Sequence, residues 1–277
     1  MRFRTEIEPA TGSFEISADT PVALVGSCFA DEIGRLLARD GVPATAGIMG
    51  PLFNPLSIKK FLDRNGRPYT PGDLTLHEGV WHCLDWANRY QHTDPDTLLE
   101  SVNADFSRLS EALTSAQCII ITFGNTKVYE TPLGIAGNCH KLPAGMFASR
   151  RLTLEEIVDA WTGIDFGHRN VILTLSPVRY TENGLAESTL AKATLRVAID
   201  RICSRNGWDY FPAFEILNDD LRDYRFYASD LKHPSDTAIE YVYQHFCETY
   251  MSRATRETLK EHRKASLTAA HHPILHS

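Results

Sequence analysis

The sequence predicts an α/β fold built on a parallel sheet, for three reasons. Short apolar runs alternate along the chain with longer stretches of helical periodicity. The clearest run, QCIIITF at residues 117–123, is continuously apolar, as in a strand covered on both faces. Strands separated by helices pair in parallel through right-handed crossovers. We therefore expect one parallel sheet with helices packed on both of its faces.

The individual elements follow this alternation in chain order. Strands are expected at residues 22–25, 117–123, 170–175 and 208–211. Helices are expected at residues 30–39, 96–113, 153–161, 185–205 and 235–251. Two excursions interrupt the rhythm at the rim of the sheet: a hairpin at residues 74–84 that turns at Glu78-Gly79, and a hairpin or lid-like segment at residues 128–135. We expect a single domain over residues 1–252 and a C-terminal tail at 253–277, either helical or frayed.

Composition narrows the class of protein. The chain has 277 residues, 43% of them apolar, and is long enough to bury a full core without disulfides. Its net charge of -7 and the lack of a basic stripe argue against nucleic-acid and membrane-surface partners. The six cysteines stand singly, which disfavours a zinc site and fits a reducing compartment. No apolar run reaches the roughly 20 residues of a membrane span, and the first residues do not resemble a signal peptide. We expect a cytoplasmic protein and leave its oligomeric state open.

Ser27 is the first candidate for chemistry. It follows Gly26 where the first apolar strand gives way to a helix. In a parallel α/β sheet, ligands bind at the carboxyl ends of the strands, and a helix N-terminus there offers free N–H groups to an oxyanion. The alternative is that Ser27 is only a helix N-cap, which is a common role for serine. Cys28 is a weaker rival nucleophile, because adjacent side chains point in different directions.

A possible base lies near the other end of the chain. Asp230 and His233 are three residues apart, on a turn that leads into the last long predicted helix. Pro234 keeps His233 out of helical geometry and suits the first position of that helix. The positive end of the helix favours a neutral imidazole, while Asp230 can hold its other nitrogen. The alternative is a capping turn in which Asp230 and Ser235 satisfy backbone donors. Ser27, Asp230 and His233 together favour a serine hydrolase or acyltransferase.

These residues resemble the GSCFA domain family, which is named after the pentapeptide found here at residues 26–30 and is related to the SGNH (GDSL-like) hydrolases. Further matching segments lie at residues 53–55, 122–124, 128–130, 138–141, 176–179, 210–212, 223–227 and 230–235. The resemblance spans roughly residues 20 to 250. It implies a flavodoxin-like, three-layer fold with parallel strand order 2-1-3-4-5 and a catalytic triad of Ser27, Asp230 and His233.

The resemblance also implies an oxyanion hole made of the Ser27 backbone N–H, a glycine N–H and an amide side chain. Gly47 and Gly50 are the glycine candidates, in the loop GIMGPLFNP. The related enzymes read G-x-N after the third strand, whereas this chain reads Gly124-Asn125-Thr126. Asn125, Thr126 and Asn138 are therefore three alternatives for the side-chain donor.

Four further residues are candidates for substrate binding. They are Asn54, His140, Lys141 and Arg179. Asn54 can instead hold its own loop in shape, His140 and Lys141 can belong to a solvated loop, and Arg179 can form a salt bridge.

The function expected from the residues and the resemblance is an esterase or acyltransferase that acts on an O-acyl ester, with a carbohydrate as one possible carrier. No metal or organic cofactor is expected. The alternative is a non-catalytic ligand-binding module on the same fold.

Overall fold

The molecule is built around one parallel five-stranded sheet. The computed structural model describes residues 4–271. The order across the sheet is β2-β1-β6-β10-β11, and every pairing is parallel. The strands are β1 (Val22–Gly26), β2 (Ala44–Thr45), β6 (Cys118–Phe123), β10 (Asn170–Leu175) and β11 (Asp209–Phe211). Numbered within this sheet in chain order, the sequence of strands is 2-1-3-4-5. The predicted α/β class with a parallel sheet is confirmed.

Alternate residues of each strand point into two separate cores. Ala23, Ile119 and Leu173 face one side, where they pack with the longest helices of the fold. Leu24 and Ile120 face the other side. Because successive side chains of a strand point to opposite faces, a fully apolar strand supplies both cores at once. The continuous apolar runs in the sequence have this cause.

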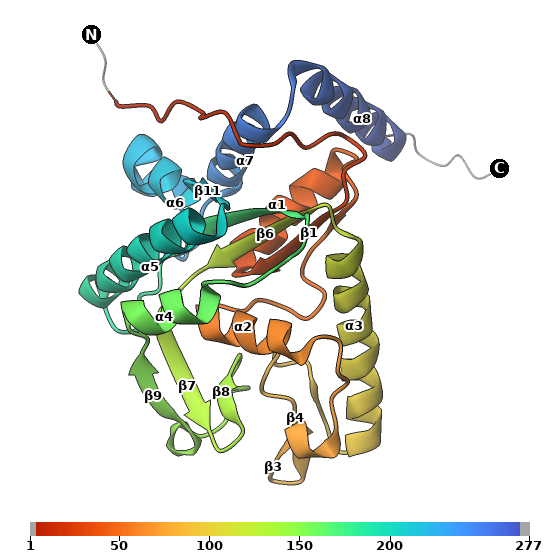
Figure 1. Cartoon of the computed structure of the whole chain (residues 1–277), viewed down its shortest axis with the longest axis vertical. Helices are drawn as coiled ribbons and strands as arrows, with labels where there is room; N and C mark the ends of the chain where they lie inside the picture. Colours follow the sequence, from red (N-terminus) through yellow and green to blue (C-terminus); the bar gives the residue numbers. More distant parts are fainter. Residues whose placement is uncertain (1–3, 272–277) are drawn as a thin grey trace, which may run out of the picture.

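Helices cover both faces (Figure 1). On the first face lie α2 (Pro55–Arg64), α3 (Pro95–Ser115), α4 (Leu154–Trp161) and α5 (Leu185–Asn206). On the second lie α1 (Cys28–Arg39) and α7 (Asp236–Tyr250). The five predicted helices agree with α1, α3, α4, α5 and α7 to within two residues at each end. Helix α2 was not predicted, although its Asn54 N-cap and Pro55 at the first turn are a readable start signal.

Short elements join the main ones. They comprise 3-10 turns at Pro71–Asp73, Ala144–Met146 and Tyr224–Phe226, and α6 (Ala213–Glu215), which continues into a π-helical segment at Ile216–Leu221.

Two small antiparallel sheets lie beyond the same side of the central sheet, in the lower part of Figure 1. One contains β3 (Thr75–His77), β4 (Val80–His82) and β5 (Gln91–His92), and its first turn is the predicted Glu78-Gly79. The other contains β7 (Lys127–Thr131), β8 (Gly134–Ala136) and β9 (Ala148–Arg151). The segment at 128–135 is therefore a hairpin, to which β9 adds a third strand.

The chain continues after α7 with α8 (Arg253–His271). Residues 253–271 of the predicted tail are thus helical, and positions 272–277 lie outside the described residues. In the part of the chain that the structure describes, no helix is long and apolar enough to cross a membrane.

Candidate active site

Ser27 lies where β1 ends and α1 begins. Gly26, immediately before it, has φ 131°, and a Cβ at that position would lie 2.2 Å from the carbonyl oxygen of Thr122. Only glycine allows β1 to approach β6 this closely in that conformation. The Ser27 N–H donates to the same Thr122 oxygen at 3.2 Å. This bond occupies the backbone donor that was expected in the oxyanion hole.

The Ser27 side chain is buried and has no hydrogen-bond partner. It is 1% exposed, and none of the described residues bonds its Oγ. The residue occupies the N-cap position of α1, but its side chain makes no capping hydrogen bond. The interpretation as a simple helix cap is therefore wrong for the hydroxyl. A buried hydroxyl without a partner costs about 1–3 kcal/mol, and such a group requires an explanation.

Two loops enclose Ser27. Leu52 donates its N–H to the Gly26 carbonyl at 2.7 Å, and the Phe53 carbonyl accepts the N–H groups of Gly124 and Asn125. A Cβ on Gly124 would lie 3.4 Å from the Ser27 Cβ. The loop before α2 and the turn after β6 are thus bonded to each other beside Ser27.

Among the amide candidates, Asn125 directly follows Gly124, the residue that approaches Ser27. Its Oδ1 accepts the N–H groups of Thr126 and Lys127, at 2.8 and 3.3 Å. These contacts direct the oxygen into its own turn, so the amide nitrogen faces away from it. Thr126 is buried, and its carbonyl accepts from Leu152.

The two glycine candidates lie in one turn, where Gly50 donates its N–H to the Gly47 carbonyl at 3.3 Å. A Cβ on Gly47 would lie 3.3 Å from the Asp31 carboxyl, and burial raises the pKa of Asp31 to about 6. A Cβ on Gly50 would lie 2.5 Å from the Ala87 side chain. The turn is therefore packed between α1 and residues 83–90, and the Gly50 N–H is already bonded.

Asp230 and His233, which the sequence pairs as acid and base, are in contact. His233 Nδ1 lies 2.6 Å from Asp230 Oδ2. Asp230 Oδ1 also accepts the N–H groups of Lys232 and His233. The hydrogen bond with His233, together with these backbone bonds, holds the pKa of Asp230 well below its ordinary value. When Nδ1 donates to the carboxylate, Nε2 carries the lone pair and can accept a proton.

The Asp230–His233 turn is hydrogen-bonded to a segment at the carboxyl ends of the strands, the same end of the sheet at which Ser27 lies. The N–H of Arg179, which follows β10, donates to the Lys232 carbonyl at 3.0 Å. Pro234 pairs with Tyr227 in an isolated bridge and precedes the Ser235 N-cap of α7, so the prediction that it opens the helix is wrong. Asp230 both accepts backbone N–H groups of this turn and holds the imidazole. The capping turn and the contact with His233, which the sequence analysis treated as alternatives, therefore occur together.

Ser27 and His233 do not bond each other here. The Ser27 hydroxyl is partnerless and buried, whereas the His233 side chain is 50% exposed. The nucleophile–base hydrogen bond expected for a triad is therefore not formed in this structure. Catalytic hydrogen bonds commonly tighten only when substrate is bound.

Arg179 stacks on aromatic rings. Its guanidinium lies 4.3 Å from the ring centroid of Tyr227 and 5.0 Å from that of Tyr224. Burial lowers the pKa of Arg179, but contacts with these two tyrosines outweigh it and raise the pKa overall. Among the described residues, Arg179 forms no salt bridge with a carboxylate. Its position braces the turn that carries His233.

Asn54 occupies the position of a helix cap. Its Oδ1 accepts the Ser57 N–H and its Nδ2 donates to Ser57 Oγ, both at 2.8 Å. Of the two uses foreseen for Asn54, the structure describes the one in which it holds its own loop in shape.

His140 lies in a buried pair of histidines. Its Nε2 lies 2.9 Å from the Trp86 carbonyl and its Nδ1 3.2 Å from His82 Nδ1. Since a carbonyl only accepts, His140 Nε2 donates, and His82 Nδ1 must then donate to His140. Burial lowers the pKa of His140 to about 4. Asn138 accepts the His140 N–H, and Lys141 is exposed. These contacts join the loop to residues 82–86, and no bond links it to Ser27.

Lys192 was missed by the sequence reading. It lies on α5, is 4% exposed, and donates from Nζ to the carbonyls of Gly124 and Ser176 at 2.8 and 2.6 Å. Burial lowers its pKa to about 7. Its spacing with Ser188, Leu195 and Ile199, which are also buried, follows the inner face of a helix. A lysine on that face was the signal available in the sequence.

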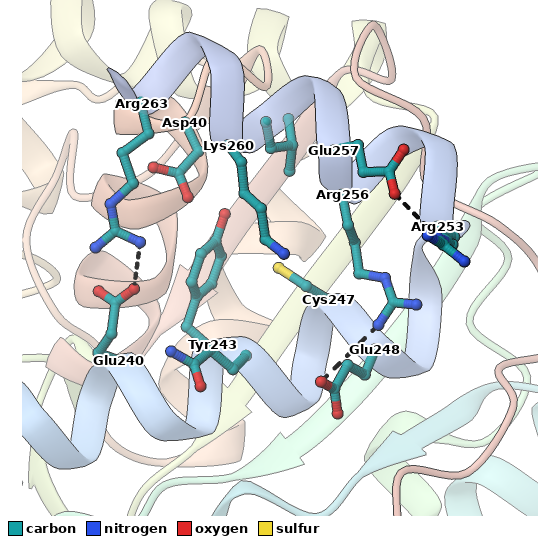
Figure 2. A pocket seen from close by; sticks show the side chains of 12 residues that line it. Asp40, Glu240, Tyr243, Cys247, Glu248, Arg253, Arg256, Glu257, Lys260 and Arg263 are labelled. Carbon is teal, nitrogen blue, oxygen red and sulfur yellow. Dashed lines mark hydrogen bonds and ion pairs between the residues drawn. The ribbon is translucent and has the colours of Figure 1, made fainter. Parts of the chain in front are cut away.

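A separate cavity of about 560 Å³ lies between α7 and α8 (Figure 2). Arg263 bonds Glu240 at 2.7 Å, and Arg256 approaches Glu248 at 3.9 Å across the gap. Asp40 pairs with Arg39 at 2.6 Å. Because these pairs largely cancel its charge, the cavity favours neither an anion nor a cation.

No group of three or more His, Cys, Asp or Glu residues within residues 4–271 is placed to hold a metal ion. Neither the curated proteins nor the solved structures contain a match to this chain. A family model does match, over residues 21–246, a range that includes Ser27, Lys192, Asp230 and His233. The chain therefore belongs to the GSCFA family.

Proposed function

We propose that the protein is an SGNH-like serine esterase or acyltransferase that acts on an O-acyl ester. The observation that carries the proposal is the 2.6 Å contact between Asp230 and His233, which leaves Nε2 as a base. The turn that holds this pair is bonded to the segment after β10, at the edge of the sheet where Ser27 presents an unpartnered hydroxyl. The strand order 2-1-3-4-5 supports placing the fold with the SGNH hydrolases.

In the proposed reaction, His233 Nε2 takes the proton of Ser27 as Oγ bonds to the acyl carbon. The carbonyl electron pair moves onto oxygen, and the Asn125 amide nitrogen is the candidate donor to that oxyanion. Collapse breaks the ester C–O bond, and the leaving oxygen takes the proton from His233. Water or an acceptor hydroxyl then attacks the acyl-enzyme with the same proton transfers, which regenerates Ser27. No step calls for a metal or organic cofactor.

The acyl carrier proposed is a small molecule or a carbohydrate. The six cysteines are all free thiols, which supports a reducing compartment, and we propose the cytoplasm.

A fluorophosphonate probe tests the proposal. It phosphonylates an activated serine, so we expect one covalent adduct on the wild-type protein and none on Ser27→Ala. Ser188→Ala, a buried serine on α5, is the matched control and should label like the wild type. Cys28→Ala should also label, because Cys28 is the rival nucleophile. Absence of a Ser27-dependent adduct, together with no hydrolysis across a panel of small acyl esters, would refute the proposal that the protein is a serine esterase or acyltransferase.

The second candidate is a non-catalytic ligand-binding module. One observation favours it: Ser27 is 1% exposed and does not bond His233. This candidate predicts no adduct in the probe experiment. If an adduct forms, an acyl donor supplied with and without acceptor alcohols separates hydrolysis from transfer, since a transferase releases acylated acceptor instead of free acid.

A further inference from the structure

Lys192 is a buried cation without an ionic partner. No carboxylate of the described residues forms an ion pair with it, and its ammonium contacts backbone carbonyls instead. Burying a charge is costly unless hydrogen bonds compensate for it. Charge-assisted hydrogen bonds are roughly twice as strong as neutral ones. The two carbonyls that Lys192 contacts are therefore held firmly.

These carbonyls belong to two different loops at the edge of the sheet. Gly124 follows β6, and Ser176 follows β10. The peptide bond between Gly124 and Asn125 is fixed at both ends, because its oxygen accepts from Lys192 and its N–H donates to the Phe53 carbonyl at 2.7 Å. Since a peptide unit is planar, these two bonds set the direction in which the chain continues to Asn125. Ser176 ties in the segment that leads to Arg179 and hence to the His233 turn.

The other groups around the ammonium are the Phe214 ring, with its centroid 5.9 Å from Nζ, and Cys28, the titratable group that interacts with it electrostatically. Cys28 follows Ser27 directly. When Lys192 is protonated, its charge therefore acts on the first residue of α1.

We propose that Lys192 is a positioning residue for the site: its ammonium clamps the carbonyls of Gly124 and Ser176 and so fixes the Gly124–Asn125 turn beside Ser27. The clamp itself rests on contacts in the structure. Its catalytic consequence rests on the proposed function, because only an acyl-transfer reaction needs Asn125 as an oxyanion donor.

Two readouts on the same variants test this. The first is hydrogen exchange by mass spectrometry over peptides that contain residues 123–127 and 176–180. We expect Lys192→Met, which keeps most of the volume, to lose protection in both segments. Ile199→Ala, a buried position two turns further along α5, is the control for general destabilisation and should leave both segments protected. Unchanged exchange in Lys192→Met would overturn the clamp.

The second readout is the rate of fluorophosphonate labelling at Ser27. We expect Lys192→Met to lower the maximal rate about 100-fold with an unchanged half-saturating probe concentration, because misplacement of a site by about 1 Å costs that much. The Ile199→Ala protein should label at the wild-type rate. Loose loops with wild-type labelling would overturn the catalytic role.

Lys192→Gln serves if Lys192→Met does not fold. Its shorter side chain can reach at most one of the carbonyls, so we expect lost protection in at least one segment and a smaller fall in the labelling rate. A wild-type protein that does not label at Ser27 would refute the proposed function, while the exchange experiment would still decide whether Lys192 orders the two loops.

Discussion

At the scale of single residues, Ser27 and Asp230 differ in both burial and hydrogen bonding of their side chains. Ser27 is buried and makes no hydrogen bond from its hydroxyl, which costs stability. Asp230 is exposed but takes part in three hydrogen bonds within four residues of chain, which lower its pKa. The short turn therefore keeps the Asp230 carboxylate ionised and directed at one imidazole nitrogen. This preorganised pair is the strongest support for acid–base chemistry at the site.

Asp230→Asn should lower the rate of Ser27 labelling about 10³–10⁴-fold while the protein stays folded. The asparagine oxygen can still accept the Lys232 and His233 N–H groups, so the turn persists. Its amide nitrogen, however, donates to His233 Nδ1 and forces the ring proton onto Nε2, which then cannot accept a proton from Ser27. The measurement is the probe-labelling rate at neutral pH.

Asp223→Asn is the matched control for that substitution. Asp223 caps a neighbouring turn by accepting the Arg225 N–H, but its carboxylate holds no histidine. Labelling of this variant should equal that of the wild type. Equal labelling of Asp230→Asn and wild type would remove Asp230 from the mechanism.

At the scale of elements, α7 contacts the His233 turn, α1 and α8. It begins directly after the His233 turn, packs in the second core with α1, and bonds α8 through Glu240. Glu240 accepts from Arg39 of α1 at 2.9 Å and from Arg263 of α8 at 2.7 Å. Burial raises the pKa of Glu240, but these arginines outweigh that effect and hold the pKa below its ordinary value. Helix α8 lies beyond the family match, so this carboxylate joins the family's shared region to the following helix.

Glu240→Gln should destabilise the protein by about 1 kcal/mol at pH 7, because Arg39 and Arg263 lose the partly buried carboxylate that links them, although Arg39 keeps its pair with Asp40. A carboxylate with a lowered pKa stabilises the folded state above its unfolded pKa and loses that contribution as the pH falls. The difference between wild type and Glu240→Gln should therefore shrink as the pH is lowered towards 4. Urea denaturation at both pH values measures it.

Glu261→Gln, at an exposed position of α8, should change stability by less than about 0.5 kcal/mol and provides the control. A loss at Glu240 that is as large at pH 4 as at pH 7 would show that packing, rather than the ion pairs, accounts for it.

At the scale of the whole molecule, the positions of the strands and helices were easier to predict from the sequence than the contacts of the candidate site residues. Strand and helix positions follow from local patterns, and five helices agreed to within two residues. The Asp230–His233 contact was also predictable, because both partners lie on one short turn. Long-range pairing was not. Asn54 and His140 were read as substrate-binding candidates, but the partners that engage them here come from a helix start and from Trp86 and His82.

Lys192 shows why such contacts escape a reading of the sequence. Its two acceptors are backbone carbonyls 68 and 16 residues away. Because every residue has a backbone carbonyl, the amino-acid types at those positions do not reveal the contact. The Ser27 N–H was expected to be free for the same reason, whereas it bonds the Thr122 carbonyl across the sheet. Backbone partners supplied by neighbouring strands appear only once the topology is known.

The fully folded protein should be most stable between about pH 7 and 9. Burial lowers the pKa of His140 from 6.5 to about 4 and that of Lys192 from 10.5 to about 7. The unfolded chain therefore binds more protons than the folded one between the two pKa values of each group, on the acid side for His140 and above pH 7 for Lys192. Through His140, stability should rise with pH from about 4 to 6.5, and the buried Asp31, with its pKa raised to about 6, offsets part of this rise. Lys192 should add a further rise above pH 7, each group contributing at most about 1.4 kcal/mol per pH unit. Burial raises the pKa of Cys83 and Cys118, which reverses the trend above about pH 9.

Denaturation profiles from pH 5 to 9.5 test this. His140→Gln should flatten the acid limb, and Lys192→Met should flatten the rise above pH 7. Profiles of the two variants that run parallel to the wild type would show that these groups do not set the pH dependence.

The close contact between Gly26 and Thr122 separates two kinds of constraint on adjacent positions. At position 26, any side chain would collide with the backbone of the neighbouring strand, so tolerance there is limited by whether the protein folds. At position 27, a side chain of similar size without the hydroxyl fits the same space. A variant library sorted by protein abundance would therefore reject changes at the glycine and accept alanine at the serine. In the pentapeptide at residues 26–30, the fold thus requires Gly26 because of the close backbone contact. It does not require the hydroxyl of Ser27, which makes no hydrogen bond.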